Sequence, residues 1–273
     1  MRRATIEEAA SRSSTMRAAP VLLAMLALAG CAAPNLAPPT SAPSPIHPWG
    51  ITHCAFVIAA VPVDEAKLAA RLPKGFTLAP GRLSALPAGP RAAIELDAYR
   101  CASGVAFDGN LTDLAYGSHY AAVTPPDALK EKGYDAVFVK WDFLAPDAPR
   151  RAVFLQAGLP AHAGDATVDI SQTGSVQATL TFADGGGFSV TGMIQPPQPA
   201  GAPLPFMEYT PLADGGLARW HARLHDASIG SGAGVVQLAP GSWVRDVVGS
   251  DSAPATIIAG TWNLDEADVT FRV

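Results

Sequence analysis

The chain has 273 residues, of which 49% are hydrophobic and 16% are charged, and its formal net charge is −5. A mildly acidic chain without a basic run lacks the electrostatic footprint of a nucleic-acid-binding protein, so nucleic acid is not an expected partner. This length is sufficient for one sizeable domain or two small ones.

The first element is an apolar run at 21–31, which follows Met16-Arg17 and ends in Leu-Ala-Gly-Cys. It is too short to span a bilayer as a mature helix, and it has the order of a secretory signal: charge, apolar segment, small residues. Its last four residues resemble a bacterial lipobox, which implies that Cys31 is acylated and becomes the first mature residue. The alternative is an ordinary signal peptide. We predict a signal peptide at 1–30, with Met16 as an alternative translation start.

Residues 31–49 are rich in proline, alanine and serine, a composition that packs no core and favours extended segments. We interpret them as a tether between the lipidated cysteine and a single domain at 50–273. The expected partner of the N-terminus is a membrane, bound through the lipid, and the domain is expected to face the periplasm or the cell surface. In a bacterium with two membranes, Ala32 after the cysteine favours the outer membrane.

After acylation of Cys31, the remaining cysteines are Cys54 and Cys101. An oxidising compartment favours a disulfide between them, and two buried thiols are the alternative. The sequence has no CxxC, no HExxH and no close cluster of histidine and cysteine, so it predicts neither a zinc site nor another cofactor.

The rest of the chain is typical of short strands separated by turns, with few helices. The first strand, 54–61, is apolar, and Asp64 after it is placed to cap a helix over 65–72. Further strands are predicted at 92–101, 116–123, 136–143, 151–157, 166–171, 176–182, 188–194 and 217–225. The strand at 92–101 alternates, with Ile94, Leu96 and Ala98 on one face and Glu95, Asp97 and Tyr99 on the other.

Residues typical of turns predict the hairpins and loops in the second half of the chain. The glycine run at 184–187 predicts a hairpin, and the glycine-rich segment 230–234 predicts a flexible turn. A helix capped by Ser242 is expected at 242–248, and a last hairpin is expected across Asp265-Glu266. The fold class that follows is α+β, mainly antiparallel β, forming a curved or closed barrel.

The order of these elements resembles the start of the acetoacetate decarboxylase family. The shared features are the strand at 54–61, a short helix ending at Leu72-Pro73, and a strand at 92–101 that carries Glu95. The segment 159–164 (LPAHAG) resembles the active-site turn of that family, in which proline precedes two lysines, an apolar residue and glycine. The resemblance covers about 50–250 and implies a barrel of this family's type with a few peripheral helices. Related barrels often assemble, so a homo-oligomer is an open expectation.

The residues that carry the family's chemistry are mostly replaced in this chain. Its enzymes form a Schiff base between the substrate ketone and a lysine whose pKa is depressed by desolvation and a neighbouring cation. The resemblance places Ala161 and His162 at the two lysines, Ser118 at a second glutamate and His53 at a binding arginine; Glu95 falls on a family glutamate. Because alanine has no nucleophile and imidazole forms no stable imine, the sequence does not predict Schiff-base decarboxylation.

Lys140 is a separate candidate, because it lies inside the predicted strand 136–143. Strict alternation places it on one face with Asp142. We expect it to pair with a carboxylate such as Asp142 or to reach water, and a desolvated, reactive amine is the alternative.

The strand at 217–225 carries four basic side chains on one face: Arg219, His221, Arg223 and His225. Such a face can hold an anion, because arginine offers two parallel hydrogen bonds and histidine can donate or accept. A solvated outer face balanced by nearby acids is the interpretation that we favour.

If the family fold holds, several polar residues are expected to converge in the barrel mouth: His53, Glu95, Ser118, His119 and His162. Glu95, His162 and His53 are the candidates for proton transfer. The candidates for ligand binding are Glu95, Ser118, His53, His162, Arg219 and His221.

The leading hypothesis is a lipid-anchored extracytoplasmic protein whose barrel binds a small, anionic or keto-bearing molecule without Schiff-base catalysis. The first alternative is a lyase, hydratase or isomerase on the same scaffold, using Glu95 and a histidine. The second is a non-catalytic structural lipoprotein with a filled barrel. Pocket volume separates the filled barrel from the other two.

Overall fold

A computed structural model describes residues 46–79, 92–106, 109–145, 147–271 and 273, which fall within one compact unit. The predicted signal peptide, Cys31 and the tether up to residue 45 lie outside the described residues. None of the helices in the described ranges has the length and apolarity needed to cross a bilayer.

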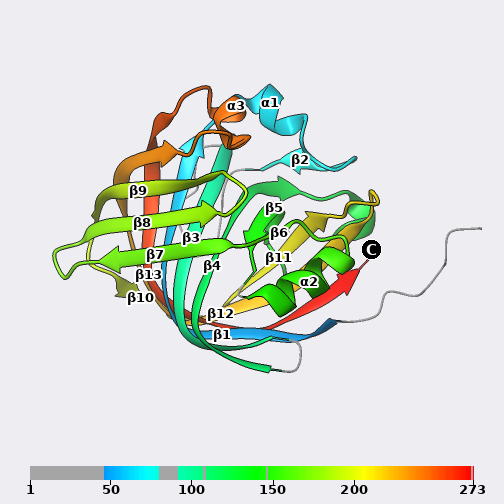
Figure 1. Ribbon diagram of the computed structural model, residues 1–273, viewed down its shortest axis with the longest axis horizontal. Helices are drawn as coiled ribbons and strands as arrows, with labels where there is room; N and C mark the ends of the chain where they lie inside the picture. Colours follow the sequence, from blue (N-terminus) through cyan, green and yellow to red (C-terminus); the bar gives the residue numbers. More distant parts are fainter. Residues whose placement is uncertain (1–45, 80–91, 107–108, 146, 272) are drawn as a thin grey trace, which may run out of the picture. The chain divides into compact units, whose positions relative to one another are not determined.

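Strands dominate these ranges (Figure 1). The longer strands are β1 (Ile46–Pro62), β3 (Ala93–Ala106), β4 (Gly109–Thr124), β5 (Ala136–Leu144), β7 (Gly164–Ile170), β8 (Ser175–Phe182), β9 (Gly187–Ile194), β11 (Leu204–Pro211), β12 (Leu217–Leu238) and β13 (Ser252–Phe271). The two-residue strands are β2 (Thr77–Leu78), β6 (Ala161–His162) and β10 (Gln198–Pro199). The helices are α1 (Glu65–Ala69), a 3-10 turn η1 (Asp127–Leu129), α2 (Ala148–Gln156) and α3 (Val244–Val248).

Seven strands form a closed ring, which we call the barrel. Their order is β11–β5–β4–β3–β1–β13–β12, and β12 pairs back onto β11. Neighbouring strands are antiparallel except β11 and β5, which run parallel. The predicted class, a mainly antiparallel closed barrel with few helices, is confirmed.

Three strands extend the sheet beyond the barrel: β9, β8 and β7, which we call the wing (left in Figure 1). The wing begins where the last part of β12 pairs with β9, and β7 then lies against β3 and β4. The predicted hairpin at 184–187 joins β8 to β9. Gly185, Gly186 and Gly187 all have φ near +100°, a backbone conformation that suits glycine.

Three of the predicted secondary-structure elements are wrong. Residues 151–157 belong mostly to helix α2, because the Asp147 side chain caps its N-terminus and Pro149 suits its first turn. The segment 230–234 is not a turn but the middle of β12, where β9 packs so close that a Cβ at Gly232 would lie 1.9 Å from the Met193 carbonyl oxygen. The expected hairpin across 265–266 is absent, because β13 runs through these residues to Phe271.

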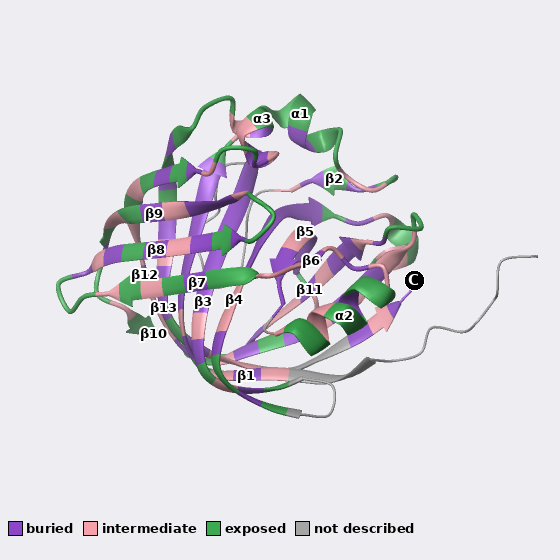
Figure 2. Ribbon diagram, in the orientation of Figure 1, coloured by how far each residue is buried: buried purple, intermediate pink, exposed green. Residues whose placement is uncertain are grey.

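Much of β3 is buried (Figure 2), and its alternation separates two apolar cores. Tyr99 and Cys101 belong to the core inside the barrel, whereas Ile94, Leu96 and Ala98 belong to the core between the barrel and the wing. The predicted faces of this strand are therefore confirmed. Because Glu95 and Asp97 share the inward face with Tyr99, this strand carries two acids into the barrel.

Cys54 and Cys101 lie directly opposite each other on β1 and β3. In the structure they form a disulfide, the arrangement that the sequence had left open against two thiols. The bond ties the first strand of the domain to the strand that carries the buried acids.

Candidate functional site

The candidate site is a small cavity inside the barrel, with a volume of about 50 Å³. Its polar lining residues are Asp97, Tyr99, Tyr116, Lys140 and Glu208. Its apolar lining residues are Ile51, Phe206, Trp220, Ala222, Leu224, Trp262 and Leu264. The polar groups come from β3, β4, β5 and β11, which are consecutive strands of the ring.

Lys140 is the cation of this cavity and is only 2% exposed. Its Nζ forms an ion pair with Glu208, donates a hydrogen bond of 3.1 Å to the Tyr116 hydroxyl and lies 4.3 Å from the centre of the Trp220 ring. Burial is the largest single effect and acts to lower the Lys140 pKa, but the charges and hydrogen bonds of Glu208 and Tyr116 together outweigh it and raise this pKa well above its ordinary value. The amine is therefore protonated at neutral pH and is not a free nucleophile.

Lys140 pairs with a carboxylate, as predicted, but the partner is Glu208 and not Asp142, and the reason is a β-bulge. The register between β4 and β5 shifts at this point, so that Tyr120 lies opposite Lys140 while His119 lies opposite Asp142. The extra residue, Trp141, breaks the alternation. Lys140 faces the barrel cavity, whereas Asp142 contacts His119 on the side of the wing.

Asp97 is a buried acid at the cavity and is 3% exposed. Its Oδ2 accepts a hydrogen bond of 2.7 Å from the Tyr99 hydroxyl, and its Oδ1 accepts one from the backbone N–H of Ser118. Burial raises the pKa of Asp97 to about 7, against the lowering effect of these two hydrogen bonds. Near neutral pH this carboxyl is therefore partly protonated and partly ionised.

Glu95 is the second buried acid and belongs to the same inward face of β3. Burial raises its pKa to about 7, while a hydrogen bond with Tyr120 opposes the shift and the charge of Asp97 adds to it. Glu95 does not line the cavity. Together with Glu208, the described interior of the barrel thus holds three carboxyls and one lysine.

The aromatic wall gives the cavity its shape. Trp262 stacks on Phe56 with ring centres 3.7 Å apart, and Tyr99 stacks on Trp262 at 5.3 Å. The indole Nε1–H of Trp262 is buried and has no hydrogen-bond partner among the described residues. A buried donor without an acceptor is unfavourable.

The predicted convergence in the barrel mouth is only partly present. Glu95 and Ser118 lie inside, with Ser118 opposite Asp97. His53 is exposed at an irregularity of β1, with φ of 53°, and its N–H donates to Asn263. In the described part of the chain, no hydrogen bond or ion pair joins Glu95 to a histidine. The alternative in which Glu95 and a histidine transfer a proton together therefore lacks a direct contact between the two side chains among the described residues.

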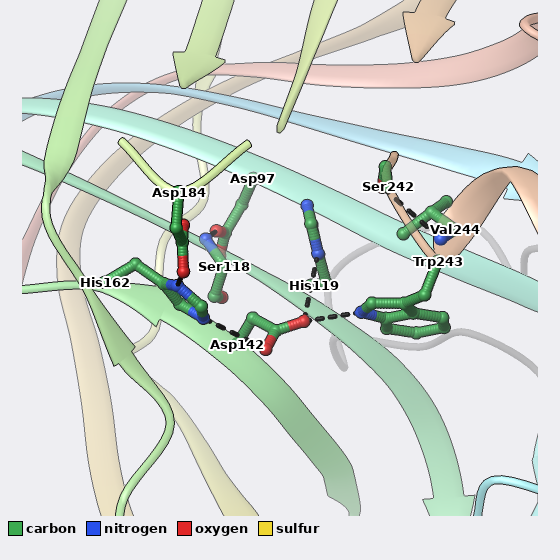
Figure 3. Close-up of polar contacts among 9 residues, drawn as sticks. All are labelled: Asp97, Ser118, His119, Asp142, His162, Asp184, Ser242, Trp243 and Val244. Atoms are coloured by element: carbon green, nitrogen blue, oxygen red, sulfur yellow. Dashed lines mark hydrogen bonds and ion pairs between the residues drawn. The ribbon is translucent and has the colours of Figure 1, made fainter. Parts of the chain in front are cut away.

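His119 and His162 lie on the opposite side of β4 and β5, toward the wing (Figure 3). Asp142 connects them: its Oδ1 is 3.2 Å from Nε2 of His162, and its Oδ2 is 3.5 Å from Nδ1 of His119. The indole of Trp243 donates to the same carboxylate at 2.6 Å. Burial acts to raise the pKa of Asp142, but these donors outweigh it and hold this pKa well below its usual range.

His162 also joins the wing to the barrel, because its Nδ1 lies 2.9 Å from Oδ2 of Asp184 on the β8–β9 turn. An imidazole that donates to two carboxylates carries both protons. The hydrogen bond with Asp142 raises the pKa of His162, although burial offsets part of the shift. A group of this kind stabilises the fold fully below its ordinary pKa and loses that contribution as the pH rises through its folded pKa.

We therefore expect His162→Gln to remove a pH-dependent part of the stability. The free energy of unfolding in urea should differ from that of the wild type more at about pH 6 than at about pH 8.5, since the imidazolium is more populated at the lower pH. His225→Gln, which alters a histidine whose ring contacts its neighbour Asp226, serves as the control. An equal difference at both pH values would contradict the assignment.

Arg219 and His221 lie on the outer face of β12, as the favoured interpretation predicted. Both pair with Glu131, and the His221 ring stacks on Tyr134 with ring centres 4.9 Å apart. This acid neutralises the basic face, so these two residues do not form an anion site in the barrel.

The position that the resemblance gives to the family lysine is occupied by Ala161, which is buried in the barrel core and pairs with Phe143. Glu208, Tyr116 and Asp97 were not among the predicted site residues. The one available signal was Lys140, a cation in a strand whose other residues are apolar except for Asp142. Among the described residues there is no group of three side chains able to hold a metal ion.

Comparison with known proteins supports the fold. No family model and no curated protein matches the chain. Among solved structures, acetoacetate decarboxylase from Legionella pneumophila is similar, with a TM-score of 0.52, 13% identity, and coverage of 89% of this chain and 95% of that one. An acetoacetate decarboxylase-like enzyme from Sphingomonas wittichii RW1 has a TM-score of 0.54, 12% identity, and coverage of 83% and 92%.

The enduracididine biosynthesis enzyme MppR, solved in complex with pyruvate, is also similar, with a TM-score of 0.50, 12% identity, and coverage of 80% and 88%. At these identities the likeness concerns the fold alone. The chain has the acetoacetate decarboxylase-like fold that the resemblance implied.

Proposed function

We propose that the barrel binds a small, uncharged molecule that carries a carbonyl group, and that it does so without forming a Schiff base. The observation that carries this proposal is the ammonium of Lys140 at the cavity. An ammonium has three N–H donors, and two of them are used by Glu208 and Tyr116. The third has no oxygen or nitrogen acceptor among the described residues, so a carbonyl oxygen is its natural partner.

The charge of the cavity favours a ketone over an anion. Lys140 is already neutralised by Glu208, and Asp97 adds negative charge whenever it is ionised. A carboxylate ligand would therefore meet net repulsion in a medium of low polarity. Of the two predicted ligand types, anionic or keto-bearing, the second fits better.

The size of the cavity limits the ligand. A volume of about 50 Å³ corresponds to roughly three to five water-sized groups, since one water needs about 10–15 Å³ on this measure. Acetone has this size. Pyruvate, which MppR binds, is also a small carbonyl compound, but it is larger than acetone and carries a carboxylate.

The test is the binding of acetone, measured by saturation-transfer NMR, with acetate as the anionic comparison. Acetone is expected to receive saturation from the protein and acetate is not. Ala222→Leu, which places a larger side chain in the cavity wall, should abolish the acetone signal, whereas Ala183→Leu on an exposed turn should preserve it. Absence of the acetone signal in the wild type would favour the filled barrel instead.

The proposed location of the protein is an expectation from its N-terminal segment. Acylation of Cys31 and attachment to a membrane, with the domain facing the periplasm or the cell surface, remain predictions from the lipobox. The Cys54–Cys101 disulfide supports an oxidising compartment, because such bonds are rare in the cytosol.

A further inference from the structure

Asp97 and Lys140 line the same cavity from β3 and β5. One is an acid whose carboxylate oxygens are already oriented, by the Tyr99 hydroxyl on Oδ2 and the Ser118 N–H on Oδ1. The other is an ammonium with one N–H donor that has no oxygen or nitrogen acceptor among the described residues. A base beside one end of a carbonyl compound and a donor beside its oxygen are the two groups that enolisation requires.

We propose that the barrel catalyses the removal and return of a proton on the carbon next to the carbonyl of a small ketone, with Asp97 as the base. This inference rests on the proposed function, since the ketone must first bind at Lys140. It assigns a catalytic role to a cavity that otherwise only binds.

The step is balanced within the site. The Asp97 carboxylate takes a proton from the α-carbon, so that a C–H bond breaks and an O–H bond forms on the carboxyl. The C–H electron pair becomes the new carbon–carbon double bond, and the carbonyl electron pair moves onto oxygen, where the Lys140 ammonium stabilises the negative charge. Return of the proton to carbon regenerates the ketone, and no oxidant, reductant or co-reactant is consumed.

The other two buried acids are placed for different tasks. Glu208 is bound to Lys140 and keeps that amine protonated. Glu95 lies outside the cavity lining and interacts with Tyr120. Asp97 is therefore the acid at the cavity that has no cation bound directly to it among the described residues.

The proton affinity of Asp97 supports the role. Burial brings its pKa to about 7, so that at neutral pH a substantial fraction is ionised and is a stronger base than an ordinary carboxylate. The titratable groups that face the barrel interior around it are Glu95, Tyr99, Tyr116, Tyr120, Lys140 and Glu208.

The experiment measures deuterium uptake by acetone in D₂O, which is followed by the loss of the proton NMR signal of acetone. The same sample is used to measure acetone binding. The wild type should accelerate uptake above the buffer rate, and the accelerated rate should rise with pH through about 7. Asp97→Asn should lower it by about 10²–10⁴-fold, the usual contribution of general acid–base catalysis. Asp169→Asn, at an exposed position of β7, should leave it unchanged.

Tyr116→Phe provides a second variant that keeps the carboxyl. It removes a hydrogen-bond acceptor of Lys140 and should alter the rate while the pH midpoint set by Asp97 remains. Borohydride added to the same mixture should leave the protein mass unchanged, which excludes uptake through an imine on Lys140.

The outcomes separate the two claims. Binding of acetone without accelerated uptake, or uptake that Asp97→Asn does not diminish in a folded variant, overturns this inference and leaves the binding function standing. Absence of acetone binding overturns both.

Discussion

Replacing Lys140 by methionine is expected to lower the free energy of unfolding by about 3–5 kcal/mol. The variant leaves Glu208, whose side chain is 14% exposed, without the ammonium that now neutralises it. A buried carboxylate that loses its partner must be protonated or remain as an uncompensated charge, and both are costly. Urea unfolding at neutral pH measures the effect.

Two further variants make this prediction specific. Lys74→Met changes an exposed lysine and should have little effect. The double variant Lys140→Met/Glu208→Met removes both charges and should recover most of the stability, because an apolar pair of similar volume often replaces a buried ion pair without loss. A single Lys140→Met variant as stable as the wild type would show that the ion pair is not buried as described.

The second large effect is a pH dependence of stability caused by Glu95 and Asp97. Burial raises both pKa values to about 7, so between about pH 4.5 and 7 these carboxyls keep a proton in the folded state that the unfolded chain has lost. Unfolding then releases protons, and rising pH favours it. Each group should lower the free energy of unfolding by about 1.4 kcal/mol per pH unit in this range, levelling off above it.

The measurement compares the wild type with Glu95→Gln and Asp97→Asn in urea at several pH values across this range. Each amide mimics the protonated acid, so each variant should lose about half of the effect and gain stability relative to the wild type as the pH rises. Asp169→Asn, an exposed acid, should follow the wild type. Differences that do not vary with pH would contradict the burial of these acids inside the barrel.

The parts of the fold that could be predicted from the sequence were those with a local pattern. The alternation of 92–101 placed Glu95, Asp97 and Tyr99 on one face, and β3 shows this arrangement. The glycine run at 184–187 predicted the β8–β9 hairpin, because this turn needs positive φ values. Where the same rules failed, a long-range contact decided: 230–234 stays in β12 because β9 packs against its glycines.

The site was harder to predict, for two physical reasons. A single bulged residue, Trp141, reverses the alternation that would have placed Lys140 beside Asp142. The true partner, Glu208, is 68 residues away and reaches Lys140 only because β11 pairs in parallel with β5. Neither feature has a local signature in the sequence.

The predicted positions of the histidines were wrong for a related reason. His53, His119 and His162 were expected to join Glu95 because the family resemblance placed them near one barrel mouth. Successive residues of a strand face opposite sides, so His119 points toward the wing while its neighbour Ser118 faces Asp97. A match in element order does not fix which side of a strand a residue faces.

The most direct test of the proposed binding site is the ¹³C NMR spectrum of acetone labelled at its carbonyl carbon, in the presence of the protein. We expect a bound resonance that is still that of a ketone, displaced by the hydrogen bond from Lys140 and lost in Ala222→Leu. A resonance of an imine carbon would show that Lys140 reacts as a free amine and would contradict the account.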